Sequence, residues 1–148
     1  MNVTIRQMQE KDLGVVSNLA MLANPHAVKA KYKRHILDEL RKSPELSFAA
    51  EVDGKVVGYA QAEVNNGIAL LEDIAVAAEF QKSGIGEKLL NEELRVLRQK
   101  KAKVVLAEVH YKCASAIPFY YKYGFRISGI AQDYFGVGHD AIILKLVL

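Results

Sequence analysis

The chain has little of the chemistry that marks secreted or membrane proteins. Its 148 residues contain one cysteine, Cys113, so no internal disulfide can form and a reducing, cytoplasmic setting is expected. No apolar run reaches the length of a membrane span, and the segment Met1–Arg6 lacks the basic-then-apolar order of a signal peptide. We therefore expect no membrane partner.

Charge of one sign is also scarce. The formal net charge of +3 is too small to argue for a nucleic-acid partner, although it suits an anionic cofactor. No metal is expected, because the histidines show no ligand spacing with one another or with the cysteine; they stand at positions 26, 35, 110 and 139. Apolar residues make up 51% of the chain, which is enough for a real core, and no linker divides it. One domain over residues 1–148 is expected.

Hydrophobic periodicity predicts strands and helices along the whole chain. Strands are expected at Val3–Gln7, Leu46–Val52, Lys55–Glu63, Ile68–Val76, Lys103–His110, Phe125–Ala131 and Ala141–Leu148. Helices are expected after a capping Asp12, from Asn24-Pro25 to about Ser43, from Gly84 to about Gln99, and over Ser115–Tyr123. Asp53-Gly54 and Asn65-Asn66-Gly67 predict the turns of a three-strand meander.

The most informative segment joins the strand Ile68–Val76 to the following helix. It reads Gln81-Lys82-Ser83-Gly84-Ile85-Gly86, and its glycines let the backbone approach a ligand while N–H groups at the helix start remain free. Such a loop predicts a phosphate or pyrophosphate site. A Walker A loop is excluded because Glu87-Lys88 follows, and a Rossmann fingerprint because position 89 is Leu.

Gln-x-x-Gly-x-Gly after such a strand resembles the coenzyme A loop of the GNAT superfamily of N-acetyltransferases. Farther along, Ala116-Ile-Pro-Phe-Tyr-Tyr-Lys-Tyr-Gly-Phe125 is similar to the segment Ala-x-x-Leu-Tyr-x-x-x-Gly-Phe of the same family. The order of the expected elements is also that of the family, and the resemblance covers essentially the whole chain. It implies an α+β fold with a mixed central sheet of about seven strands and about four helices, and acetyl-CoA as the acetyl donor.

The resemblance also implies how the cofactor is held. The pantetheine arm would pair with the backbone of Ile74, Ala75 and Val76, and the pyrophosphate would lie on Gln81, Lys82, Ser83, Gly84, Ile85 and Gly86. One departure is Cys113, where the similar branch usually has an asparagine on the pantetheine arm. Because a thiol is a weak donor, the grip there should be looser. Cys113 as an acyl-carrying nucleophile is a minor alternative, since no activating base adjoins it in sequence.

Glu108 interrupts an otherwise apolar strand. A buried carboxylate must be paired or protonated, and burial raises its pKa toward the range of a general base. A structural ion pair with Arg6 or Arg126 is the open alternative. Glu108 and Tyr120 lie twelve residues apart, as in the ribosomal-protein N-terminal acetyltransferase (RimI-like) branch. This resemblance implies that Glu108 is the base and that Tyr120 protonates the leaving thiolate.

The acceptor side is described less fully by the sequence. Tyr134 matches a substrate-side tyrosine of the same branch, in a loop expected to be mobile because of its glycines at 136 and 138. Glu72 and Asp73 are expected on opposite faces of their strand, with one of them facing the acceptor groove. His139 is expected to be solvated. The second expected helix is rich in lysine and arginine, which are expected to be solvated but would favour an acidic acceptor if this helix bordered the groove.

These features favour an enzyme that moves an acetyl group from acetyl-CoA to a primary amine. A peptide or protein N-terminal amine is favoured, while a lysine side chain, a polyamine and a small drug-like amine stay open. Two alternatives belong to other classes: a non-catalytic acyl-CoA-binding sensor, against which the presence of both Glu108 and Tyr120 argues, and a nucleotide-binding regulator that uses the same loop. The protein is expected to be a monomer or a homodimer.

Overall fold

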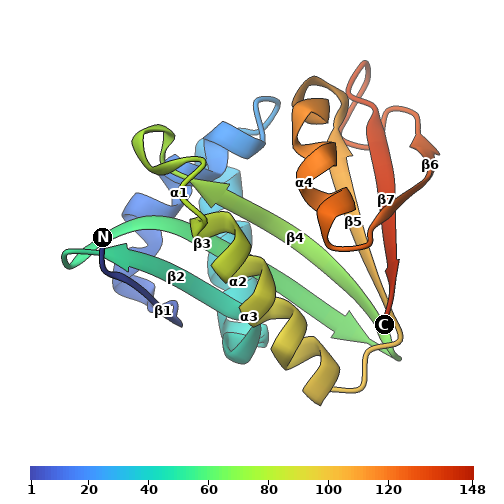
Figure 1. Ribbon diagram of the computed structural model, residues 1–148. Coiled ribbons are helices and arrows are strands. Elements are labelled where there is room, and N and C mark those ends of the chain that lie inside the picture. Colours follow the sequence, from blue (N-terminus) through green and yellow to red (C-terminus); the bar gives the residue numbers. More distant parts are fainter.

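The computed structural model describes residues 1–148 and shows a seven-stranded mixed sheet with helices on both faces (Figure 1). The strands are β1 (Val3–Gln7), β2 (Ser47–Val52), β3 (Lys55–Asn65), β4 (Ile68–Val76), β5 (Val104–His110), β6 (Arg126–Ala131) and β7 (Ala141–Val147). The helices are α1 (Leu13–Ala23), α2 (Lys29–Lys42), α3 (Ile85–Gln99) and α4 (Ile117–Lys122). This confirms the expected α+β architecture, with element ends displaced by a few residues. None of the helices has the length and apolar character needed to span a membrane.

The sheet has the order β1-β2-β3-β4-β5-β7-β6, and only β4 and β5 run parallel. Both predicted hairpin turns form. Asp53 and Gly54 have φ of 51° and 78°, and Asn66 and Gly67 have φ of 53° and 79°. A type I′ turn needs positive φ at both central residues, which these residue types tolerate.

Helices cover both faces of the sheet (Figure 1), and a core of buried side chains lies on each face. Helical periodicity in the sequence places five apolar residues on one face of α3, and all five are buried; they are Ile85, Leu89, Leu90, Leu94 and Leu97. On the other face α1 and α2 pack over Tyr59, with Val16 and Ile36 fully buried. Each such aliphatic side chain contributes about 1.5–3 kcal/mol when removed from water, so these two clusters fix the helices on the sheet.

The predicted start of the second helix is wrong. α2 begins at Lys29 rather than at Pro25, because Asn24 ends α1 instead of capping α2. Its side-chain amide donates to the Ala20 carbonyl at 2.9 Å and to the Asp73 carboxylate at 3.0 Å.

Two smaller expectations about helix ends are also corrected. Asp12 does not cap α1 with its side chain, since that carboxylate accepts from Arg6 and from the Gln9 N–H, both at 2.8 Å. The expected helix over Ser115–Tyr123 is a 3₁₀ turn, Tyr111–Ala116, followed by α4. Gly124, with φ of 95°, follows the helix as predicted.

A bulge in β4 determines which way its acidic residues face. Gln61 pairs with Asp73 and Ala62 with Leu71, so Glu72 is an extra residue without a partner on β3. Both acidic side chains consequently reach the side of α1 and α2: Glu72 approaches His35 of α2, and Asp73 binds Asn24. The expectation of opposite faces assumed regular alternation and is wrong.

β4 and β5 separate in the middle of the sheet (Figure 1). Their pairing ends at Leu71 and Ala107, after which β4 continues to pair only with β3 and β5 only with β7. Glu72 and Glu108 are therefore the first residues beyond the point of separation. An opening lined by free backbone groups and two carboxylates is set into the centre of the sheet.

We predict that the buried Glu93 makes the fold less stable as pH rises. Its side chain is fully buried in α3, neither oxygen has a hydrogen-bond partner, and burial raises its pKa well above the ordinary 4.5. Because the folded pKa exceeds the unfolded one, the stabilising contribution is complete below the ordinary value and is lost as pH rises through the folded pKa. Urea unfolding across this range should show a falling free energy of unfolding in the wild type and a flatter curve in Glu93→Gln.

An exposed glutamate elsewhere provides the control for this prediction. Glu79 is exposed and takes part in none of the salt bridges, so Glu79→Gln should keep the wild-type slope with pH. Identical slopes in Glu93→Gln and the wild type would show that the buried carboxyl does not control this pH dependence.

Candidate active site

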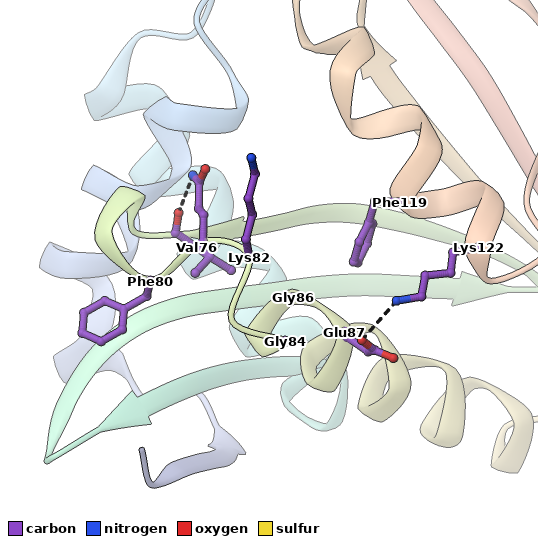
Figure 2. Close-up of a pocket in the computed structure, with 9 residues that line it drawn as sticks. Val76, Phe80, Lys82, Gly84, Gly86, Glu87, Phe119 and Lys122 are labelled. Atoms are coloured by element: carbon purple, nitrogen blue, oxygen red, sulfur yellow. Dashed lines mark hydrogen bonds and ion pairs between the residues drawn. The ribbon is translucent and has the colours of Figure 1, made fainter.

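The loop between β4 and α3, which Figure 2 shows in close-up, presents free backbone donors. The N–H of Lys88 makes the first bond of the helix, to the Gly84 carbonyl at 3.1 Å, which leaves the N–H groups of residues 85–87 without helical partners. Gly84 has φ of 87°, where a side chain is strained. The Gln81 side chain donates to the Val76 carbonyl at 3.0 Å and so braces the loop on the end of β4.

A cavity of about 350 Å³ lies over this loop (Figure 2). Lys82 and Lys122 bring positive charge to its wall, and Lys122 also pairs with Glu87 at 3.6 Å. Ile85 is buried in the core and the Ser83 hydroxyl donates to the Phe80 carbonyl, so a ligand here would meet the backbone of these two residues. Free N–H groups, a helix start and two lysines together suit a pyrophosphate.

The cavity continues as a groove of about 640 Å³ between β4 and α4, lined by Ile74, Val76, Phe119 and Tyr120. The Ala75 side chain faces the core under α1 and α2, so only its backbone can contribute. Since β4 is paired on one edge alone from Glu72 onward, its other edge offers N–H and C=O groups to an extended ligand arm. We call the loop cavity and this channel together the cofactor groove.

A small chamber of about 70 Å³ lies where β4 and β5 separate. It shares Ile74 and Tyr120 with the cofactor groove. On its other side it shares Glu72 and Glu108 with a third space, a side pocket of about 300 Å³ next to α2. The chamber thus joins two larger spaces that open from different sides of the sheet.

Tyr120 lies at the junction of the groove and the chamber. Its ring packs edge-on against Phe119 and Phe125, with centroids 5.3 and 5.4 Å away. Burial raises its pKa above the ordinary value of 10, so the phenol stays protonated near neutral pH and can act as a donor. Cys113 lines the same chamber, but its thiol points to the Ala23 carbonyl at 3.6 Å and burial raises its pKa, which disfavours a nucleophilic thiolate.

Glu108 lies on the opposite side of the chamber without a basic partner. Burial raises its pKa, and an interaction with the Tyr134 hydroxyl partly opposes the rise. The predicted alternative of an ion pair is wrong, because Arg6 binds Asp12 and Glu51 and Arg126 donates to the Phe125 carbonyl. A half-buried carboxyl with a raised pKa has the character of a general base.

The loop between β6 and β7 forms part of the wall of the side pocket. Tyr134 and Phe135 of this loop line the pocket opposite His35 of α2. The loop, expected to be mobile, is bonded internally: the Gly138 N–H donates to the Asp133 carboxylate at 2.8 Å, and the Phe135 N–H donates to the carbonyl of residue 139 at 3.0 Å.

His139 is part of a histidine cluster rather than a solvated loop residue, so that expectation is wrong. The Lys112 N–H donates to His110 Nδ1 at 3.1 Å, which leaves the proton of neutral His110 on Nε2, 2.9 Å from His139 Nδ1. The His26 ring stacks on His110 with centroids 5.0 Å apart. Sequence spacing could not reveal this cluster, because its members come from three separate segments.

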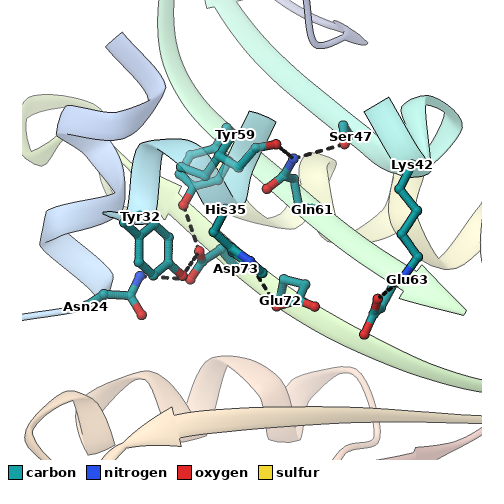
Figure 3. A network of polar contacts seen from close by, with 11 residues as sticks. Asn24, Tyr32, His35, Lys42, Ser47, Tyr59, Gln61, Glu63, Glu72 and Asp73 are labelled. Atoms are coloured by element: carbon teal, nitrogen blue, oxygen red, sulfur yellow. Dashed lines mark hydrogen bonds and ion pairs between the residues drawn. The ribbon is translucent and has the colours of Figure 1, made fainter. Parts of the chain in front are cut away.

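Asp73 is the centre of a buried network (Figure 3). Its carboxylate accepts from Asn24 at 3.0 Å, from the Tyr59 hydroxyl at 2.8 Å, and from the Tyr32 hydroxyl. Burial raises the pKa of Asp73 and these three donors oppose the rise. Asp73 therefore braces α1 and α2 against the sheet. The sequence does not reveal this role of Tyr32, because its spacing along α2 is simply that of an inward-facing residue of a helix.

The side of α2 that faces Glu72 carries an acidic residue rather than the basic residues of this helix. His35 and Glu39 approach Glu72, and one ligand atom from each lies within 4.8 Å of the others, a grouping that could hold a metal ion. The sequence expectation of no metal-ligand grouping overlooked this set because Glu72 comes from β4. The basic residues of the helix are all exposed; they are Lys29, Lys31, Lys33, Arg34, Arg41 and Lys42. These residues therefore give no reason to expect an acidic acceptor.

Comparison with known proteins agrees with this geometry. Residues 13–125 match the model of the Acetyltransferase (GNAT) family. The chain belongs to the GNAT acetyltransferase family. This acetyltransferase is 28% identical to the N-alpha-acetyltransferase of Sulfurisphaera tokodaii, over 97% of its own length and 92% of the relative. It is 31% identical to the ribosomal protein bS18-alanine N-acetyltransferase of Escherichia coli K12, over 68% and 70%. The resemblance to the RimI-like branch is thereby confirmed.

The fold comparison covers the full acetyltransferase chain. The crystal structure of Ard1 from Thermoplasma volcanium superposes with a TM-score of 0.90 at 28% identity, covering 100% of this chain and 99% of the other. The predicted GNAT fold is confirmed.

We predict that acetyl-CoA stabilises the acetyltransferase against heat and that Gly84→Asp removes most of the effect. A ligand present at about a hundred times its Kd raises the free energy of unfolding by roughly 2.7 kcal/mol. For a domain of this size this corresponds to a Tm shift of roughly 5–10 °C. The aspartate would place a negative charge beside the free N–H groups. Differential scanning calorimetry with and without acetyl-CoA measures both shifts.

Gly54→Asp is the matched control, because Gly54 also has positive φ and open space around it but lies in the β2–β3 turn. It should lose stability without losing the acetyl-CoA shift. A full shift in Gly84→Asp would refute the assignment of the loop.

Proposed function

We propose that this protein transfers the acetyl group of acetyl-CoA to the α-amine of a peptide or protein. The observation that carries the proposal is the arrangement of Tyr120 and Glu108 on opposite sides of the small chamber. Tyr120 borders the cofactor groove, and Glu108 borders the side pocket. An acetyl donor in the cofactor groove and an amine in the side pocket would therefore meet in the chamber. There they would lie between Tyr120, which can donate a proton, and Glu108, which can accept one.

The cofactor groove fits acetyl-CoA. Lys82 and the free N–H groups at the start of α3 would hold the pyrophosphate, and the open edge of β4 would pair with the pantetheine arm. Gly86 suits this role because an added Cβ would approach the Phe119 ring at 3.6 Å and narrow the groove. The thioester would then lie at the chamber, next to Tyr120. Acetyl-CoA supplies an activated acyl group there.

The transfer forms one bond and breaks one. The amine nitrogen attacks the thioester carbonyl, the C–N bond forms, and the C–S bond breaks with its electron pair going to sulfur. Tyr120 donates its proton to the departing thiolate. Before the attack, Glu108 takes one proton from the acceptor ammonium, directly or through water, because only the neutral amine can attack. The second proton, which the nitrogen loses as the amide forms, balances the one that Tyr120 gives to sulfur. Holding both reactants at the chamber supplies much of the rate.

The relatives and the side pocket support a peptide acceptor. The names of the related proteins specify N-alpha-acetyl and ribosomal-protein alanine transfer. Tyr134 lies on the side pocket close to Glu108 and can hydrogen-bond the first peptide unit. An α-amine has a pKa near 8, against about 10.4 for a lysine amine, so a weak base such as a carboxylate can remove its proton more easily.

Tyr120→Phe should lower kcat by about 10²–10⁴-fold, because that is the usual contribution of a positioned proton donor. Binding of CoA, measured by calorimetry, should change little, since the ring contacts with Phe119 and Phe125 remain. Tyr121→Phe is the control, because Tyr121 is exposed beside Arg126. Unchanged single-turnover chemistry in Tyr120→Phe would reduce Tyr120 to a packing residue.

Glu108→Gln should remove one limb of the pH profile. A base works when deprotonated, so the wild-type kcat should rise as pH passes the raised pKa of Glu108, and the glutamine variant should be slow and lack this rise. Steady-state rates across pH with a fixed peptide test this. If the variant unfolds easily while its folded fraction keeps the normal rate and profile, Glu108 is structural.

The acceptor class needs its own test. Peptides with free and with acetyl-blocked N-termini, each carrying an internal lysine, should be compared with a polyamine and with free amino acids. Turnover confined to free N-termini is expected. Turnover of small amines alone would replace the peptide acceptor and keep the acetyltransferase, while tight CoA binding without turnover of any amine would indicate an acyl-CoA sensor.

A further inference from the structure

The wall of the side pocket carries more negative charge than proton abstraction requires. Glu72 and Glu108 line the pocket, and Glu39 and Glu63 lie close behind them. Besides burial, repulsion by Glu72 and Glu63 raises the pKa of both Glu39 and Glu108. The four carboxylates therefore act on one another as a single electrostatic group.

Few positive charges offset this group. Lys42 bonds to Glu63 at 3.0 Å, and its side chain is exposed. His35 Nε2 lies 3.3 Å from the Glu72 carboxylate, which raises the pKa of His35. Lys42 and a protonated His35 offset two of the four charges at most. The remaining basic residues of α2 are exposed to solvent, where charges are largely screened.

One oxygen of Glu39 lies behind Glu72, and Glu39 itself is not among the residues that line the side pocket. This oxygen is shut off from solvent and has no hydrogen-bond partner in the protein. Glu39 and His35 are four residues apart on α2, so they share a helix face, and both lie within 4.8 Å of Glu72. Because no protein donor offsets this carboxylate, it adds to the negative potential at Glu72, which favours a positively charged ligand in the side pocket. We call Glu39 and Glu72, with His35 between them, the acidic wall (Figure 3 shows His35 and Glu72).

We propose that the acceptor is a peptide whose second residue is lysine or arginine. The acidic wall binds this side chain while the α-amine of the first residue reacts in the chamber. This inference rests on the proposed function. Glu72 lines both the chamber and the side pocket, so whatever follows the reacting amine passes this carboxylate. The side pocket, about 300 Å³, is at the small end of ligand sites, so it selects on the first residues of a chain.

The test uses three peptides that differ at the second residue. They begin Ala-Lys, Ala-Gln and Ala-Glu, and a compensating charge near the C-terminus keeps the total charge equal, which removes general steering. We expect kcat/KM to fall in the order Lys, Gln, Glu, with at least a tenfold span carried mainly by KM. The span should shrink at high salt, because part of the attraction is screened.

Enzyme variants locate the effect. Glu72→Gln and Glu39→Gln should each reduce the preference for Ala-Lys over Ala-Glu severalfold. The preference is measured as a ratio of kcat/KM within each variant, so a change in the overall rate of that variant cancels. Glu92→Gln makes the same change of charge on α3, outside the residues that line the side pocket, and should leave the preference unchanged. Circular dichroism and Tm of each variant show that the fold is kept.

The outcomes separate this inference from the function on which it rests. Equal kcat/KM for the three peptides, or a lysine preference that survives both wall variants, overturns the basic-residue inference and leaves the acetyltransferase intact. If Zn²⁺ raises the Tm of the wild type, and fails to raise it in Glu39→Gln, the acidic wall is a metal site and the inference also falls. If no peptide is acetylated, the proposed peptide acceptor itself is wrong.

Discussion

The end of pairing between β4 and β5 is the constraint on which the site depends. Up to Leu71 and Ala107 the two strands satisfy each other's backbone groups, and beyond them each has a partner on its far side only. Backbone groups without partners are costly when buried, so this opening must face a ligand or solvent. The sheet therefore supplies a binding edge, and α3 and α4, which pack near it, shape the groove around that edge.

The bulge at Glu72 determines where two acidic side chains lie beside the opening between β4 and β5. By inserting one residue, β4 turns Asp73 toward the α1 and α2 side, where it accepts from three neutral donors. That network holds the ends of α1 and α2, which carry one wall of the side pocket. The extra residue itself, Glu72, lies between the chamber and that wall. One local irregularity thus separates a bracing carboxylate from one that lines the pocket.

The electrostatics divide the molecule in a way that suits the proposed reaction. Lysines and free N–H groups gather at the cofactor groove, whereas carboxylates gather at the side pocket, only a small chamber away. An anionic donor and a cationic acceptor would each be drawn to its own side. The negative group also disfavours ionisation of Glu108, which places its pKa above that of an exposed glutamate and nearer to the range of a useful base.

Local sequence determined the elements, because periodicity, turn residues and the Gln81–Gly86 loop depend on neighbours in the chain; all seven strands and the five inward positions of α3 were predictable. Tertiary structure decided the rest. The bulge at Glu72 depends on registry with β3, the histidine cluster joins three distant segments, and the acidic wall joins α2 to β4. These are pairings between residues far apart in sequence, and no spacing along one strand or helix encodes them. That is why Tyr120 and Glu108 could be proposed from their neighbours in the chain, whereas the character of the acceptor side emerged only in three dimensions.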